Sequence, residues 1–248
     1  MIKFFSKIRQ KSLAKNKFSK YLIYAIGEII LVVIGILIAL QVNKLNEESK
    51  KETIRDSYII ALQTDLTADI DLLERQIAGY DIEISKNLAL SRRLSSTMAN
   101  ADTIKKIARY EYLPYFDPSN ELNLSTFNVL ISTGNLGLLD KDFAKKIQEH
   151  HAYQLTNLKG IDFNLKIAAN LGVEYSQEYP LNSPDNAING QIMASFWEQI
   201  DKNKLKIDLN AALTGKIFAL KAANYFRTVL LEKTKKLITE IDKTIIEN

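Results

Sequence analysis

The sequence contains no cysteine and only two histidines among its 248 residues. The absence of cysteine excludes disulfide bonds and thiolate metal sites. The histidines, His150 and His151, are neighbours. Adjacent residues on a helix point about 100° apart, so the pair cannot grip a metal ion as an i, i+4 pair can. His151 continues an apolar stripe and is expected to be a core or interface residue. We therefore predict that the chain binds no metal ion and no other cofactor.

Catalytic signatures are also missing. No serine stands in a nucleophile elbow, and no Glu-x-x-His di-metal motif occurs. The GNLG stretch at 134–137 is a lone glycine pair without a preceding strand, which argues against a phosphate-binding loop. Asp65 and Asp69 lie at the edge of an amphipathic helix, where solvated carboxylates are expected. We accordingly expect that the chain is not an enzyme.

Acidic residues are absent from the first twenty positions, which carry seven cations. These cations are Lys3, Lys7, Arg9, Lys11, Lys15, Lys17 and Lys20. They are expected to contact the anionic head groups of an inner leaflet; the alternative is a mobile basic tail that only sets orientation. The rest of the chain has 26 Lys and Arg against 29 Asp and Glu. It therefore offers no basic surface, and we expect no nucleic-acid partner.

One run of the chain is almost entirely apolar. The segment YLIYAIGEIILVVIGILIALQV, residues 21–42, has only Glu28 and Gln41 as strongly polar residues. At about 1.5 Å per residue, a helix of this length spans roughly 33 Å, which is enough to cross a bilayer. We predict a transmembrane helix over residues 21–43. A cleavable signal peptide is the alternative, but this run is long and lacks a small-x-small cleavage site.

The flanks of this helix predict its orientation. Because the excess of Lys and Arg precedes the helix, residues 1–20 are expected to be cytoplasmic. Everything after the helix then lies outside the cytoplasm, in the periplasm if the cell is Gram-negative. We predict a single-pass protein of the bacterial inner membrane with a periplasmic C-terminal domain.

One face of the predicted membrane helix is polar and small. Tyr24, Glu28, Gly35 and Ala39 lie within roughly 60° of one another on a helix that turns about 100° per residue. Gly35 and Ala39 form a small-xxx-small pair that permits close backbone approach, and Tyr24 can donate its hydroxyl to Glu28. This pattern predicts a packing face for a second copy or a partner helix. Two alternatives stay open: Glu28 reaches the cytoplasmic surface and pairs with lysine, or it carries a proton.

Beyond the membrane, helical periodicity dominates the sequence. Residues 44–57 are polar and lack Gly and Pro, so we predict that the membrane helix continues as a helical stalk. Residues 58–248 are predicted to form one helical domain. Apolar residues recur at a mean step of 3.6 in two long stripes. The first comprises Ile59, Leu62, Leu66, Ile70, Leu73, Ile77, Tyr80, Ile84 and Leu88, and the second Phe143, Ile147, His151, Leu155, Leu158, Ile161, Leu165, Ala168, Gly172, Tyr175 and Tyr179.

The predicted fold class is all-α: one N-terminal transmembrane helix followed by an extracytoplasmic helical bundle with long antiparallel helices. Further helices are predicted over residues 102–112, 122–133, 140–179 and 208–246. Gly134 is expected to end the second of these helices in the left-handed conformation, and Asp140 to cap the third. The segment 179–190 is the clearest exposed loop and a candidate for recognition. Trp197, the lone tryptophan, is expected to anchor the core.

Three blocks of the sequence resemble a family of uncharacterised single-pass membrane proteins from Gram-negative bacteria, known as a domain of unknown function. The blocks are MIKFFSKIRQ at the start, NKFSKYLIYAIGEIILVVIGILIALQVN at 16–43 and STFNVLISTGNLGLLDKDFAKKI at 125–147. The resemblance implies an anchor with a cytoplasmic N-terminus and a helical outer region. It implies no activity.

These observations favour a structural or interaction component of the membrane. Its expected partners are the lipid bilayer and either further copies of the chain or another membrane helix. A second hypothesis is an ion-coupled or transport accessory subunit in which Glu28 titrates. A third is a periplasmic ligand sensor that signals through its membrane helix.

Overall fold

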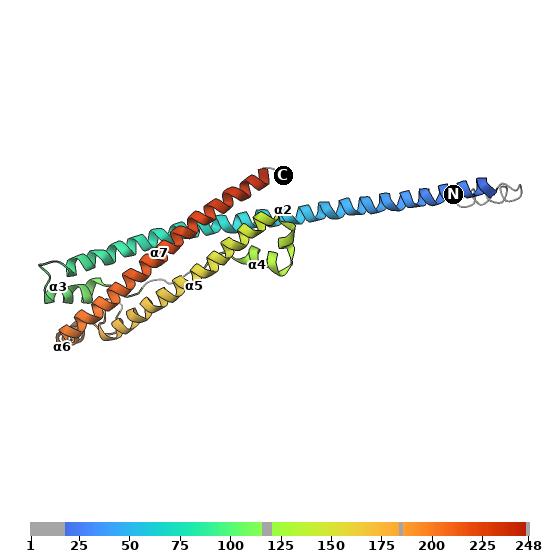
Figure 1. Cartoon of the computed structure of the whole chain (residues 1–248). Helices are drawn as coiled ribbons and strands as arrows, with labels where there is room; N and C mark the ends of the chain where they lie inside the picture. Colours follow the sequence, from blue (N-terminus) through green and yellow to red (C-terminus); the bar gives the residue numbers. More distant parts are fainter. Residues whose placement is uncertain (1–17, 116–120, 184–185, 247–248) are drawn as a thin grey trace. The chain divides into compact units, whose positions relative to one another are not determined.

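The computed structural model of the chain describes residues 18–115, 121–183 and 186–246. It is 87% helical and has no strand in these three ranges, which confirms the predicted all-α class. Its helices are α2 (Phe18–Leu94), α3 (Ala101–Lys106), the π-helix η1 (Ile107–Glu111), α4 (Ser125–Ser132), the 3-10 helix η2 (Asn135–Leu138), α5 (Lys141–Glu178), α6 (Gly190–Gln199) and α7 (Lys202–Ile246) (Figure 1). The chain divides into two units, Met1–Asp56 and Ser57–Asn248.

In the first unit, α2 carries the apolar segment and the polar segment that follows it. The helix continues without a break through residues 44–57, as the lack of Gly and Pro predicts. Local pairs on this polar stretch are exposed: Asn43 Nδ2 donates to Glu47 Oε1, and Lys44 Nζ lies 3.7 Å from Glu48 Oε1. Such pairs each add a few tenths of a kcal/mol, about 0.2–0.5, to a solvated helix.

In the second unit, the remainder of α2 packs with α5 and α7. The apolar stripe predicted for α2 is confirmed as its core face, because every third or fourth residue from Ile59 onward turns inward. Its buried members are Ile59, Leu62, Leu66, Leu73, Tyr80 and Ile84, and its half-buried members are Ile70, Ile77 and Leu88. The core is therefore a continuous seam between three long helices, divided into four clusters along its length.

Cross-helix contacts give the directions of the long helices. The helix α7 runs antiparallel to α2, since Gln63 bonds Asp242 near one end and Glu83 bonds Lys216 near the other. The helix α5, however, runs parallel to this part of α2: Leu62 shares a cluster with Ile147, and Tyr80 shares one with Leu165. The prediction that the long helices are antiparallel is therefore wrong for α2 and α5. The first turns of α5 lie beside the part of α2 that begins the second unit, since Phe143 and Ile147 share a cluster with Ile59 and Leu62 (Figure 1).

The buried face of α5 differs in part from the second predicted stripe. Between Ile147 and Ile161 the buried residues are His150, Gln154 and Asn157, whereas the apolar Leu155 is exposed. The spacing 147, 150, 154, 157, 161 keeps the helical period with its core face unbroken. The predicted stripe followed apolar residues onto the neighbouring face, and His151 is accordingly only half-buried.

The connections follow from local capping. Gly134 has φ 72° and ends α4 in the left-handed conformation, as predicted. Asp140 caps α5 by accepting from the amides of Asp142 and Phe143, also as predicted. The helix α7 starts at Lys202, six residues before the predicted start, because Asp201 accepts from the amides of Asn203 and Lys204 and caps it there.

Candidate functional site

The most unusual surface of the described chain is the apolar segment of α2. From Leu22 to Val42 every residue except the half-buried Ala25 is exposed. The large apolar side chains in this segment are between 47% (Val33) and 72% (Leu31) exposed. An 18-residue window here has a mean hydropathy of 2.7 and no buried share. Among the described residues, α2 is the one helix long and apolar enough to span a membrane.

The predicted packing face lies on this exposed segment. Tyr24, Glu28, Gly35 and Ala39 are all helical and exposed. An added Cβ at Gly35 would meet nothing within 4 Å, and the same holds at Gly27 on a different face. The face is therefore open to a neighbouring helix.

The predicted inner-leaflet cations lie almost entirely outside the described residues. Lys3, Lys7, Arg9, Lys11, Lys15 and Lys17 precede the first described residue. Lys20 belongs to the first turn of α2, but its side chain is not among those described. Their contact with a leaflet stays a prediction.

In the second unit, a buried carboxylate joins three elements. Asp69 on α2 is 0% exposed, and its Oδ1 accepts from the backbone amide of Asn123 (2.8 Å) and from Asn123 Nδ2 (3.1 Å). Its Oδ2 accepts from Gln154 Nε2 on α5 at 3.1 Å. Burial raises the pKa of Asp69 to about 6, while the bonds from Asn123 and Gln154 act in the opposite direction. The expectation that Asp69 lies on a solvated face is wrong.

The neighbouring Asp65 holds the start of α4. Its Oδ2 accepts from the amide of Thr126 at 3.1 Å and from Ser125 Oγ at 3.3 Å. The residue at the N-cap position of α4, Leu124, offers no side-chain cap. A carboxylate from another helix therefore supplies the cap that the local sequence lacks.

The two histidines have separate partners, one on α7 and one on α4. His150 Nε2 lies 2.9 Å from Thr234 Oγ1 on α7, and burial lowers the pKa of His150 to about 4. The ring of His151 stacks on Phe127 of α4 with centroids 3.8 Å apart. Neutral His150 packs against the core, and His151 covers α4. Thr234 and Phe127 belong to different helices, so the two rings contact different neighbours.

A buried lysine fixes the segment that leaves η1. Lys216 on α7 is 1% exposed, and its Nζ donates to the carbonyls of Leu113 (2.8 Å) and Tyr115 (3.3 Å) and to Glu83 Oε2 (3.3 Å). Burial lowers the pKa of Lys216. On the other side of this segment an added Cβ at Gly172 would lie 2.8 Å from the carbonyl oxygen of Pro114, so only glycine permits this approach.

A buried arginine plays a similar part further along α7. Arg227 is 1% exposed, its Nε donates to Gln76 Oε1 at 2.8 Å, and its guanidinium carbon lies 4.6 Å from the ring centroid of Tyr80. Both partners belong to α2, so this cation joins α7 to α2 through a hydrogen bond and a cation–π contact.

An aromatic cluster fills the core beside α3 and α6. The ring centroids of Tyr112 and Tyr175 are 5.2 Å apart in an edge-to-face arrangement, and Tyr179 lies 5.1 Å from Tyr175. Tyr179 donates its hydroxyl to Asp208 Oδ2 at 2.7 Å, and its pKa is raised to about 12 by burial and by this carboxylate. Trp197, 2% exposed, donates from Nε1 to the carbonyl of Pro180. Its predicted role as a core anchor is confirmed.

The polar groups described above join separate elements of the second unit. Asp69 bonds Asn123 and α5, His150 bonds α7, and Lys216 and Arg227 both bond α2. Among the described residues no group of three or more Asp, Glu or His side chains could hold a metal ion. The sequence offered one signal for them: each falls on the inward face of its helix when the 3.6-residue period is continued through polar positions.

Comparison with known proteins gives one match. No curated protein and no solved structure matches the chain. The match is to a family model. It covers the exposed apolar segment from Glu28, the α2 stripe, α3 and η1, and it ends before α4. The predicted likeness to a domain of unknown function is confirmed: residues 28–116 match the model of a family of unknown function, DUF6090.

Proposed function

We propose that the chain is a single-pass membrane protein that acts as a structural or interaction component. In this proposal residues 1–20 are cytoplasmic, the helix over 21–43 spans the inner membrane, and the helical unit from Ser57 onward lies in the periplasm. The membrane helix contacts a second copy or a partner helix through Tyr24, Glu28, Gly35 and Ala39. The membrane helix anchors the helical unit, which is then held at the periplasmic side of the membrane.

The exposed apolar segment is the observation that supports this proposal. About fifteen large apolar side chains between Leu22 and Val42 are exposed. Transfer of one such side chain out of water is worth about 1.5–3 kcal/mol, so leaving all of them in water costs tens of kcal/mol. A bilayer removes this cost, and a helix satisfies its own backbone within the hydrocarbon.

The topology can be tested because the chain has no cysteine of its own. A single introduced thiol is then the only one, and its labelling reports one position. We expect Ser49→Cys to react with a membrane-impermeant maleimide in intact spheroplasts and Ser6→Cys to react only after lysis. Labelling of Ser6→Cys alone in intact spheroplasts would reverse the orientation, and mass spectrometry that shows removal of residue 6 would replace the anchor by a cleaved signal.

The packing face has a matched control within the same helix. Gly35→Leu places a bulky side chain on the face, whereas Gly27→Leu places the same side chain about 80° away. Neither substitution meets another atom of the chain within 4 Å. We expect Gly35→Leu to reduce crosslinked oligomers or co-purified partner by about tenfold, because a small-xxx-small contact depends on close approach. Equal effects of the two variants would rule out this face.

Thiol crosslinking separates the two kinds of partner. If the neighbour is a second copy, Gly35→Cys should form disulfide-linked dimers in oxidised membranes and Gly27→Cys should not. If the neighbour is another protein, neither variant should form dimers, and Gly35→Leu should still lose the co-purified species. Dimers from both cysteines to the same extent would indicate random collision.

A further inference from the structure

A small cavity lies where α3, α6 and the start of α7 meet, at one end of the second unit. Its volume is about 90 Å³. Five apolar side chains line it: Ala101, Ile104, Trp197, Ile200 and Leu205. A water molecule occupies about 30 Å³ of liquid, and a dry cavity of about 150 Å³ holds benzene. The space thus fits a group of a few carbon atoms, and it belongs to none of the polar contacts described above.

The apolar wall of the cavity is fixed in place. Trp197 is almost fully buried, and its indole N–H is already bonded to the carbonyl of Pro180, 3.2 Å away. Its remaining surface toward the cavity is ring carbon, since the indole has no other polar group. Leu205 is buried, and Ile104 and Ile200 pack against the same core cluster. The wall therefore offers contacts to an apolar group and no hydrogen bond.

The rim of the cavity carries an excess of positive charge. Lys105, Lys202 and Lys206 line it together with one acid, Asp102. None of these three lysines has a carboxylate partner within the described ranges, whereas the nearby Lys204 is paired with Glu178 and Asp208. The second unit as a whole is slightly acidic, with 22 Lys and Arg against 24 Asp and Glu. The positive rim is thus local and is not the general character of the surface.

We propose that this cavity binds a small carboxylate with a short apolar chain. The apolar chain lies against Trp197, Ile104 and Leu205, and the carboxylate lies at the rim near Lys105, Lys202 and Lys206. Apolar walls with a few convergent charged groups are the usual composition of small-molecule sites. For about six heavy atoms the affinity is expected to be in the millimolar range. The inference is independent of membrane insertion, because every residue in it belongs to the second unit.

The chain supplies its own reporter. Trp197 is the only tryptophan, so selectively excited fluorescence of the full-length protein in detergent comes from the cavity wall. Butyrate is the probe, 1-butanol the neutral analogue with the same chain, and inorganic phosphate the anion without one. We expect a saturable change in Trp197 emission with butyrate, a weaker one with butanol, and none with phosphate.

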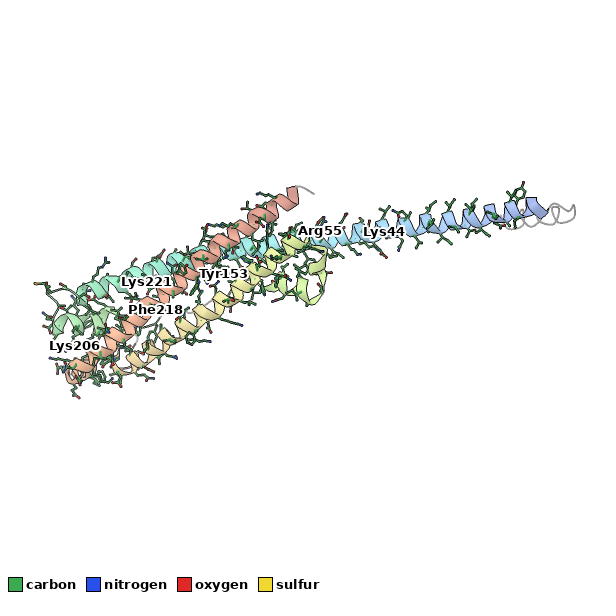
Figure 2. The ribbon with its side chains drawn as sticks, in the orientation of Figure 1. Lys44, Arg55, Tyr153, Lys206, Phe218 and Lys221 are labelled. Atoms are coloured by element: carbon green, nitrogen blue, oxygen red, sulfur yellow. The ribbon has the colours of Figure 1, made fainter. Side chains whose placement is uncertain are left out.

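Charge reversal at the rim has a matched control on exposed lysines elsewhere. Lys202→Glu combined with Lys206→Glu should weaken butyrate binding about tenfold, because two attractions between exposed charges become repulsions. Lys159→Glu combined with Lys221→Glu changes the net charge equally but leaves the cavity intact, and it should bind butyrate as the wild type does. Lys206 lies at the start of α7 and Lys221 further along it (Figure 2). Ala101→Leu, which narrows the cavity without changing charge, should also weaken binding.

Three results would overturn the inference. No saturable emission change with butyrate would remove the site. Equal binding of butyrate and butanol would make it an apolar cavity without anion recognition. Equal loss in the two double variants would show a general charge effect. Circular dichroism of each variant confirms that the helices are intact before binding is compared.

Discussion

The two parts of α2 show how differently one helix can place its apolar residues. Between Leu22 and Val42 apolar side chains cover the whole circumference and all large ones are exposed. From Ile59 to Leu88 they form a single stripe, and most of them are buried against α5 and α7. The first pattern suits a surrounding that is apolar on all sides, and the second suits a boundary between a core and water. Both parts belong to one continuous helix, so the difference between them lies in the surroundings that each distribution of apolar side chains suits.

The largest expected effect is the loss of membrane retention when charges are placed in the apolar segment. Val33→Arg combined with Leu37→Arg puts two cations near the middle of the apolar segment, at a cost of about 2.5–3.5 kcal/mol each in a bilayer. We expect the double variant to shift from the membrane pellet to the alkali-extractable fraction. Phe218→Arg, at an exposed apolar residue of α7 (Figure 2), should leave membrane retention unchanged. Full retention of the double variant would contradict a hydrocarbon surrounding.

Truncation of the core should have the next largest effect. Leu220 is 0% exposed, and Leu220→Ala is expected to lower the free energy of unfolding of the second unit by about 3 kcal/mol, through lost transfer energy and the cavity left behind. Phe218→Ala, two residues away on the opposite face of α7 and 67% exposed, should change it by less than about 0.5 kcal/mol. Urea unfolding followed by Trp197 fluorescence gives both values. Similar losses in the two variants would mean that the described core face of α7 is wrong.

Removal of the buried lysine should cost somewhat less. Lys216→Met keeps most of the volume but leaves the carbonyls of Leu113 and Tyr115 without their donor. We expect a loss of about 2 kcal/mol in unfolding free energy, within the range for a buried charged group that loses its bonds. Limited proteolysis should also cut sooner near residue 115. Lys221→Met, an exposed position on the same helix, is the control, and an equal response there would deny Lys216 its anchoring role.

The smallest expected effect is a pH dependence of the unfolding free energy, which arises from two buried titrating groups. The folded pKa of Asp69 is raised to about 6, so its ionisation makes the folded state less stable as pH rises from about 4 to 6. The folded pKa of His150 is lowered to about 4, so its contribution is present above about pH 6.5 and is lost as pH falls toward 4. The two groups therefore oppose each other in the same pH window.

Asp69→Asn separates the two groups. The amide cannot ionise, and its oxygen can still accept from the amide of Asn123. Relative to wild type, the variant should gain about 1–2 kcal/mol in unfolding free energy between about pH 4.5 and pH 7.5, because only the wild type acquires a buried charge. Urea titrations at the two pH values measure this difference. Identical pH profiles for both proteins would show that Asp69 keeps an ordinary pKa.

Much of the local structure could be predicted because short-range rules govern it. The α2 stripe, the left-handed turn at Gly134 and the Asp140 cap depend on residues within one or two helical turns. The exposed apolar segment was equally predictable, since length and composition alone decide whether a helix can span a bilayer. Its packing face and orientation stay predictions, because both depend on a partner or a membrane outside the chain.

The inward polar residues could not be predicted in the same way. Gln154 and Asn157 are buried while Leu155 is exposed, so hydrophobicity alone gave the wrong face between Ile147 and Ile161. Gln154 donates to Asp69 on another helix, whereas Asn157 donates to the carbonyl of Tyr153 one turn earlier in α5. A buried polar group is stable only when its hydrogen bonds are made, and for Gln154 and Asp69 that bond joins residues far apart in sequence.

By itself, the sequence determined that the chain is helical, where its apolar segment lies and which side of α2 faces a core, because these properties follow from composition and period. Tertiary structure alone decided that α5 runs parallel to α2, that Asp69, Lys216 and Arg227 are buried, and that Trp197 borders a cavity with three lysines at its rim. The physical reason is that direction, burial of polar groups and cavity shape are set by contacts between helices, and no single helix carries that information in its own residues.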